Sequence, residues 1–187
     1  MPRICPYKGA IVASKRHQTR HQGEKLHAWP KLVLTCLVFA FDHLMEAALD
    51  EARRARDAGE VPIGAVVALD EAIVGRGFNQ PISSGDPTAH AEIVAVRDAA
   101  ARVGNYRLRG AVMCVTIEPC LMCVGALVHA RIATLVFGAA EPKTGAVTST
   151  VRGLDLPGHN HRVEVVAGVR EAECRELMQQ FFLERRI

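Results

Sequence analysis

Apolar and polar positions follow two periods along the chain, and each period predicts one kind of element. Four segments have the spacing of an amphipathic helix: 42–58, 88–103, 120–131 and 171–185. Three short apolar runs have the character of buried strands: 111–117, 133–139 and 162–168. Two further apolar segments, 63–70 and 72–79, meet at a tight turn near Asp70 and predict a β-hairpin. Residues 80–87 predict a loop.

The order of these elements predicts the fold class. Strands that alternate with helices favour a three-layer α/β domain, in which the sheet is mostly parallel after the opening hairpin. The chain has 187 residues, of which 49% are hydrophobic and 23% are charged, as in one globular domain. No stretch of the sequence approaches the ~20 consecutive apolar residues of a membrane helix. We expect a single domain over 38–187.

The first forty residues differ from this body. Residues 1–41 hold seven basic side chains and one acid, whereas the remainder is slightly acidic, with 16 basic against 19 acidic residues. The apolar run at 32–41 is compatible with a secretory signal, and the basic composition with an organellar transit peptide. We favour a dispensable extension upstream of a start near Val38, because the charged stretch is too long for a signal peptide. Residues 1–37 are therefore expected to be a leader.

The cysteines give an expectation about location. The chain has six, at positions 5, 36, 114, 120, 123 and 174, which are too few and too irregularly spaced for a disulfide scaffold of this length. A reducing cytoplasm is therefore the expected compartment.

Two short segments contain the residue types of a metal site. In the first, 86–92 (DPTAHAE), a loop turns into a helix, so that Asp86 or Thr88 is the expected N-cap and His90 falls in or next to the first turn. In the second, 118–123 (EPCLMC), a strand turns into a helix, with Pro119 expected in the first turn and both cysteines on one helix face.

Together these segments supply one imidazole and two thiolates. His90, Cys120 and Cys123 form a zinc ligand set with three protein donors, and an open fourth position is typical of a catalytic zinc, which lowers the pKa of water to about 7. Glu92 lies two residues after His90, where a carboxylate can take a proton from that water and deliver it to a leaving amine. This pairing of H-x-E with P-C-x-x-C indicates a zinc deaminase.

Two other interpretations of the cysteine pair stay open. A C-x-x-C near a βαβ pattern can be a redox dithiol. A closed structural site would need Cys114 as its fourth ligand. Cys114 lies among apolar neighbours in the strand predicted at 111–117, and it fits a core position better. Cys174 is also expected in the core.

Seven segments in family order resemble the bacterial tRNA-specific adenosine deaminases, the TadA family. They are VPIGAVV (61–67), GFNQPI (77–82), DPTAHAEI (86–93), NYRL (105–108), TIEPCLMC (116–123), FGAAEPKTGA (137–146) and NHRVEV (160–165). The deaminase signature is shared with cytosine and guanine deaminases, whereas the other segments together favour the tRNA branch.

This resemblance implies a cytidine-deaminase-like fold, with a five-stranded mixed sheet between helices, and usually a homodimer. It implies conversion of the wobble adenosine of a tRNA anticodon, typically an arginine tRNA, to inosine, with one zinc ion per subunit. His90, Cys120 and Cys123 match the family's zinc ligands, Glu92 matches its proton shuttle, and Asn79 matches the asparagine that contacts the target nucleoside. The base would be presented unstacked, which an anticodon loop makes less costly.

The RNA contacts are less specific. Glu141 stands where many members have an aspartate that approaches the target ribose, and its longer side chain moves the charge. Six basic residues are candidates for contacts with RNA: Arg107, Arg109, Lys143, Arg162, Arg185 and Arg186. Two alternative functions remain: a free nucleobase deaminase of guanine or cytosine type, and a non-catalytic, zinc-stabilised RNA-binding module. Affinity that falls steeply with salt would distinguish an RNA enzyme from a nucleobase deaminase.

Overall fold

The computed structural model describes the backbone of residues 31–185 and the side chains of residues 40–185. Its elements in chain order are α1 (Lys31–Asp57), β1 (Gly64–Leu69), β2 (Ala72–Phe78), α2 (Pro81–Ser84), α3 (Ala91–Val103), β3 (Val112–Ile117), α4 (Leu121–Ala130), β4 (Thr134–Ala139), a 3-10 turn (Gly153–Asp155), β5 (Glu164–Ala167) and α5 (Glu171–Glu184). The expected leader up to residue 30 lies outside the described residues, and its expected boundary at 37/38 falls within α1.

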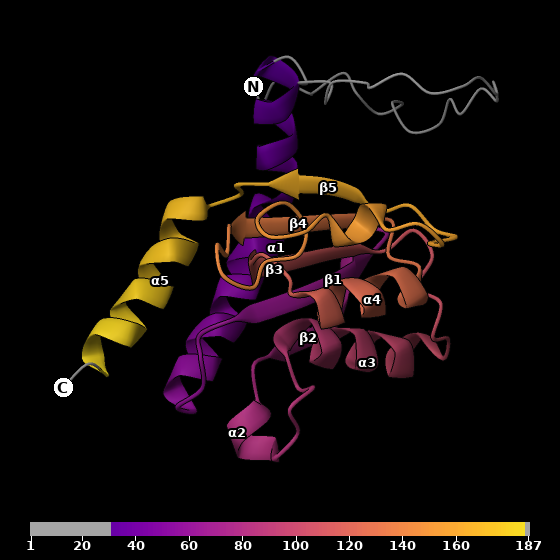
Figure 1. Ribbon diagram of the computed structural model, residues 1–187. Coiled ribbons are helices and arrows are strands. Elements are labelled where there is room, and N and C mark those ends of the chain that lie inside the picture. The colour runs from indigo at the N-terminus through magenta and orange to yellow at the C-terminus, as the bar shows by residue number, and fades with distance from the viewer. Residues whose placement is uncertain (1–30, 186–187) are drawn as a thin grey trace.

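The five strands form one mixed sheet in the order β2-β1-β3-β4-β5. Strand β1 pairs antiparallel with both β2 and β3, whereas β3, β4 and β5 run parallel. Helices α1 and α5 cover one face of the sheet, and α3 and α4 cover the other (Figure 1). The predicted three-layer α/β class and the five-stranded mixed sheet are therefore confirmed.

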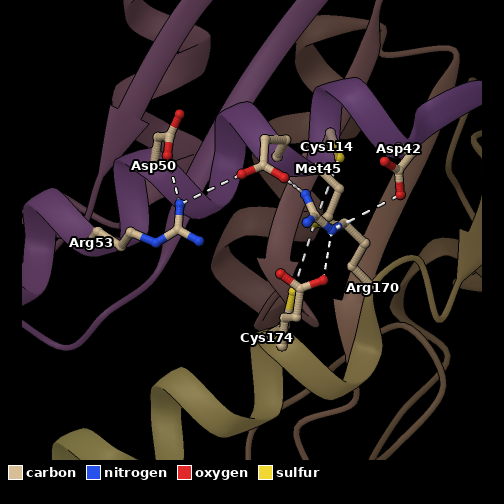
Figure 2. A network of polar contacts seen from close by, with 9 residues as sticks. Asp42, Met45, Asp50, Arg53, Cys114, Arg170 and Cys174 are labelled. Carbon is tan, nitrogen blue, oxygen red and sulfur yellow. Dashed lines mark hydrogen bonds and ion pairs between the residues drawn. The ribbon is translucent and has the colours of Figure 1, made fainter.

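Each face of the sheet has its own hydrophobic core under the helices that cover it, and the side chains of β3 point alternately into one core and the other. Met113 and Val115 are fully buried under α3 and α4, whereas Cys114 is fully buried on the α1 and α5 face. The Sγ atoms of Cys114 and Cys174 both contact the sulfur of Met45, at 3.9 and 3.8 Å (Figure 2). Both cysteines are therefore core residues, as predicted.

Arg170 joins the start of α5 to α1 beside this sulfur cluster. It precedes α5 in the left-handed backbone region, with φ of 50°. Its side chain is only 21% exposed, and its guanidinium forms ion pairs with three acids: Asp42, which is labelled in Figure 2, Glu46 and Glu173. Helices α1 and α5 lie on the face of the sheet opposite α3 and α4. These ion pairs therefore stabilise the packing of α1 and α5 and do not reach the residues expected to bind a metal.

Three parts of the chain differ from the sequence prediction by three residues or more. The first helix begins at Lys31 rather than at 42, since the apolar run expected in the leader continues the helix. The segment 80–87, expected to be a loop, contains the short helix α2, which has Pro81 at its first position and ends at Gly85 with φ of 63°. Helix α3 begins at Ala91 rather than at 88. Within the described part of the chain, no helix is long and apolar enough to cross a membrane.

Candidate active site

His90 and Glu92 lie at the N-terminus of α3, next to the end of β2. His90 is the N-cap, with extended backbone (φ −70°, ψ 152°), and Glu92 is in the first turn. The helix begins here because the N–H of Ala91, its first residue, donates to Oδ1 of Asn79 at 3.0 Å. Asn79 directly follows β2, so the sheet fixes where this helix starts.

The expected N-cap at Asp86 or Thr88 is wrong. Asp86 Oδ1 accepts hydrogen bonds from the backbone N–H of Thr88 at 2.8 Å and from its hydroxyl at 2.7 Å. Asp86 therefore closes a turn before the helix instead of capping it, since a short acidic side chain readily bonds the backbone two residues further on.

Cys120 and Cys123 lie at the N-terminus of α4, which follows β3. Cys120 is the N-cap, with extended backbone (φ −75°, ψ 172°), and Cys123 is buried in the first turn. Pro119 lies before the N-cap, so its expected place in the first helical turn is wrong. Its carbonyl instead accepts the N–H of Ala146 at 2.8 Å.

The three expected metal ligands meet at one point. His90 Nδ1 lies 3.6 Å from the Sγ atoms of both Cys120 and Cys123, and the three ligand atoms all lie within 4.8 Å of one another. Tetrahedral bonds of about 2.0–2.1 Å from zinc to nitrogen and about 2.3 Å to sulfur would separate these ligand atoms by about 3.5 Å. The residues present therefore fit a zinc ion.

Charge in this group also favours a cation. The hydrogen bond from Cys123 lowers the pKa of the Cys120 thiol to about 4. The same contact raises the pKa of Cys123, because a second anion beside the first is opposed. The contact with Cys120 in turn raises the pKa of His90. A cation bound between the two cysteines would favour the thiolate form of both, because cysteine binds metals as a thiolate.

His90, Cys120 and Cys123 are called the metal-binding group below. Glu92 adjoins this group and is 4% exposed. Burial away from water raises the pKa of its carboxyl group above the usual range. A carboxyl group with a raised pKa holds a proton more readily than an exposed carboxylate does, which suits a general acid–base. This is the position in which the sequence placed a proton shuttle.

Cys114 does not join the metal-binding group. Among the described residues, the potential ligands gathered at this point are His90, Cys120 and Cys123. Cys114 faces the opposite side of the sheet, against Met45. The closed four-ligand site with Cys114 is therefore wrong, and three protein ligands leave a position open.

Three of the remaining expected substrate contacts follow strands of the sheet near the metal-binding group: Asn79, Glu141 and Lys143. Asn79 is 5% exposed, and its Oδ1 is already bonded to the Ala91 N–H. Glu141 and Lys143 follow β4, and Glu141 Oε1 accepts the N–H of Lys143 at 2.9 Å. The same loop is joined to the metal-binding group by a bridge between Gly145 and Cys120.

The other expected RNA contacts lie elsewhere. Arg107 and Arg109 are exposed in the connection that leads into β3, and Arg162 is exposed before β5. These are the amino ends of the parallel strands, whereas Cys120 of the metal-binding group comes three residues after the carboxyl end of β3. Arg185 donates to the carbonyl of Gly59 at 2.9 Å, and Arg186 lies outside the described residues. The structure therefore places only Lys143 of the basic candidates on the loop joined to the metal-binding group.

Glu118 has a role that the sequence analysis missed. It follows β3, is 4% exposed, and accepts hydrogen bonds from four residues of the loop after β4: Glu141, Val147, Thr148 and Ser149. Burial opposes its charge, but the hydrogen bonds, with that of the Ser149 hydroxyl foremost, lower the pKa of Glu118 to about 2. The available sequence signal was an acid directly after the apolar run 111–117, where a charge needs several hydrogen-bond donors.

Comparisons with known proteins agree with this geometry. The MafB19-like deaminase family matches residues 40–186. The tRNA-specific adenosine deaminase of Haemophilus influenzae is 46% identical over 78% of this chain and 84% of its own length. That of Agrobacterium fabrum is 47% identical over 78% of this chain and 95% of its own.

Solved structures show the same fold. One from a study of A-to-I editing by tRNA:A34 deaminases at the wobble position of transfer RNA has a TM-score of 0.71 and 47% identity, covering 72% of this chain and 98% of that one. Guanine deaminase from Bacillus subtilis has a TM-score of 0.51 and 34% identity, covering 66% of this chain and 82% of its own. The metal-binding group, the fold and the relatives together show that the chain belongs to the family of tRNA-specific adenosine deaminases.

Proposed function

We propose that this protein deaminates the wobble adenosine of a tRNA anticodon to inosine, with an arginine tRNA as its expected substrate. The observation that supports the chemistry is the meeting of His90, Cys120 and Cys123 beside the buried carboxyl group of Glu92. The relatives named as tRNA-specific adenosine deaminases support the substrate. A cytoplasmic location follows from such a substrate.

In the proposed mechanism, His90, Cys120 and Cys123 would hold one zinc ion per subunit. When bound, the ion would lower the pKa of water, so that water could act as a nucleophile at neutral pH. The role of Glu92 is to accept a proton from the attacking water and to donate a proton to the departing nitrogen. The carbon that bears the amino group gains the oxygen of water and loses ammonia, which balances the conversion of adenosine to inosine.

Asn79 and Glu141 are proposed to position the nucleoside. Because Oδ1 of Asn79 is bonded to Ala91, the side-chain NH₂ is the group that can donate to a base. Glu141 supplies an acceptor for a ribose hydroxyl from the loop that also bears Lys143, which can contact a phosphate.

Arg107, Arg109 and Arg162 are proposed as more remote phosphate contacts. These arginines lie at the opposite end of the parallel strands from the metal-binding group. They can contact an RNA bound at that group only if the RNA wraps around the subunit, or if the arginines belong to a second subunit. A homodimer is the proposed assembly. Its support on this chain is the exposure of two apolar side chains in the first turn of α4, Leu121 (53%) and Met122 (38%).

The test uses the full chain loaded with zinc and an anticodon stem-loop with adenosine at the wobble position. Sequencing reads inosine, and free guanine, cytosine and adenosine are assayed in parallel for ammonia. We expect inosine at that one position, no turnover of the free bases, and an apparent affinity that falls steeply as salt rises. Comparison of arginine and other tRNA stem-loops then defines the substrate, and light scattering defines the assembly.

A free nucleobase deaminase is the second candidate, since the Bacillus subtilis guanine deaminase is 34% identical to this chain in the matched region. Ammonia from free guanine or cytosine, without inosine in RNA, would replace the proposed function with this one. RNA binding without any turnover by folded, zinc-loaded protein would instead favour the non-catalytic module.

A further inference from the structure

Glu118 connects the strand that leads to Cys120 with the segment that follows β4. Its Oε1 accepts the backbone N–H groups of three consecutive residues: Val147 at 3.0 Å, Thr148 at 2.7 Å and Ser149 at 3.0 Å. Its Oε2 accepts the N–H of Glu141 at 3.1 Å and the hydroxyl of Ser149. One carboxylate therefore holds both ends of residues 141–149, which we call the Glu118-bound loop.

Consecutive N–H groups that converge on one oxygen form a concave site for an anion. In this protein the anion is the side chain of Glu118 itself, brought from about thirty residues earlier in the chain. Without it, the three N–H groups would lose a shared charged acceptor. Val147 is buried, so its N–H would be left without a partner at a cost in free energy, whereas Thr148 and Ser149 are exposed and would turn to water, which leaves this conformation without its anchor. The loop conformation therefore depends on this carboxylate.

Two further contacts bring the loop against the metal-binding group. The N–H of Ala146 donates to the carbonyl of Pro119 at 2.8 Å, and Gly145 forms a bridge with Cys120. Gly145 lies so close that a Cβ atom there would be 2.6 Å from Glu118 Oε2 and 2.5 Å from the carbonyl of Glu141. This spacing requires glycine and packs the loop directly on residues 118–120.

We propose that Glu118 is a positioning residue for substrate binding, which holds the Glu118-bound loop so that Glu141 and Lys143 meet the RNA in a fixed arrangement. The inference rests on the proposed function for the identity of the substrate. In the described structure, the hydrogen bonds of the Glu118 carboxylate all run to residues 141–149, and none runs to a donor atom of His90, Cys120 or Cys123. A loop that is ordered before binding loses less conformational entropy when RNA binds, so its anchor contributes to affinity.

A purely structural role makes a different prediction. Loss of Glu118 would then lower the melting temperature, while the remaining folded enzyme would keep the KM and kcat of the unmodified protein. A positioning role raises KM more than it lowers kcat, since Glu92 and the metal ligands stay in place. Measurement of KM and kcat therefore distinguishes a positioning role of Glu118 from a purely structural one.

The experiment compares Glu118→Gln with Ser149→Ala and with a control, Glu51→Gln. Glu51 is also buried (3% exposed) and accepts hydrogen bonds from Arg54 and Arg76, but it lies on α1 at the opposite face of the sheet. Zinc-loaded full chains are assayed on the wobble-adenosine stem-loop, with zinc content measured for each. Hydrogen exchange follows the amides of Val147, Thr148 and Ser149.

For Glu118→Gln we expect KM to rise about tenfold or more, with kcat little changed and one zinc retained, because a charged acceptor of several bonds is lost. The three amides should exchange faster. Ser149→Ala, which removes one hydroxyl from the surface, should give a smaller rise in KM in a protein that folds normally. Glu51→Gln should leave KM and the three amides unchanged.

Two results would overturn the inference: an unchanged KM in folded, zinc-loaded Glu118→Gln protein, or an equal rise in KM for Glu51→Gln. Failure of the proposed function looks different, because the unmodified protein would then make no inosine at all. In that case the hydrogen exchange still decides the anchoring, and unchanged protection of the three amides in Glu118→Gln would refute it.

Discussion

Asn79 Oδ1 accepts a hydrogen bond from the backbone N–H of Ala91 at 3.0 Å, across twelve residues of chain. The N-cap residue of α3, His90, makes no side-chain capping bond, so Asn79 performs this function from the end of β2. The bond joins the sheet to the helix turn that bears His90 and Glu92. Asn79 therefore has a structural role in addition to its proposed contact with the nucleoside.

Substitution of Asn79 separates these two roles. Asn79→Ala removes the acceptor, and we expect the free energy of unfolding to fall by about 0.5–2 kcal/mol, as for other lost helix caps. Asn79→Asp keeps an acceptor at a helix N-terminus, where a negative charge is favourable, and should recover most of this stability. Both variants lack the side-chain NH₂ and should lose deamination. Urea denaturation and inosine formation give the two measurements, and full activity in Asn79→Asp would show that the NH₂ group does not bind substrate.

Glu92→Gln should slow deamination severely while the protein stays folded and binds zinc. Burial raises the pKa of Glu92, which means that the fold opposes its charge, so a neutral amide of the same shape is tolerated. An amide cannot shuttle protons, and we expect the rate to fall by about 10²–10⁴-fold. Single-turnover inosine formation at saturating RNA measures the chemical step.

Zinc content and melting temperature are the controls for this variant. Both should match those of the unmodified protein, since Glu92 is not among the three gathered ligands. Substantial turnover by zinc-loaded Glu92→Gln protein would contradict the proton-shuttle role.

Sequence periodicity predicted the sheet and its covering helices because burial on one face repeats along each element. The strands expected at 111–117 and 133–139 correspond to β3 and β4 within one residue at their starts. The same reasoning placed His90, Cys120 and Cys123 at helix N-termini, which is where the structure has them. Local pattern was sufficient for these features.

Periodicity failed where distant groups decide the local structure. The start of α3 depends on Asn79, and the loop after β4 depends on Glu118, which bonds residues about thirty positions away. No local pattern of apolar residues reports such bonds. The remoteness of Arg107 from the metal-binding group was also invisible, because it follows from the direction in which β3 crosses the sheet.

Removal of zinc should make Cys120 the reactive thiol of the described chain. Its pKa is lowered to about 4 by Cys123, so it is a thiolate at any pH above that value and should react with iodoacetamide even near pH 6. Burial instead raises the pKa of Cys174 to about 12 and also raises that of Cys114, so both should stay unmodified. Peptide mass spectrometry after brief alkylation measures each cysteine separately.

Zinc added before the reagent provides the control. Coordination occupies the sulfur of Cys120 and should protect it, whereas Cys114 and Cys174 should not respond to zinc. Equal alkylation of Cys120 with and without zinc would contradict its assignment as a ligand.

Gly77→Ala should destabilise the protein and reduce its activity. A Cβ atom at Gly77 would lie 2.5 Å from both the carbonyl oxygen of Ala91 and the backbone nitrogen of Ala95. These are backbone atoms of α3 and cannot rotate away, so the whole helix must shift, at a cost of about 1–3 kcal/mol. The shift moves the first turn, which bears Glu92. Urea denaturation and inosine formation measure the two effects.

Gly125→Ala is the matched control for this variant. Gly125 lies inside α4, and apart from the adjacent residues and backbone of that helix an added Cβ meets no described atom within 4 Å. Alanine favours a helix over glycine by about 0.5–1 kcal/mol, so this variant should gain stability. The two substitutions add the same methyl group, and opposite signs would therefore identify the close contact of β2 with α3 as the cause. Equal losses in both variants would show instead that the contact does not fix the position of α3.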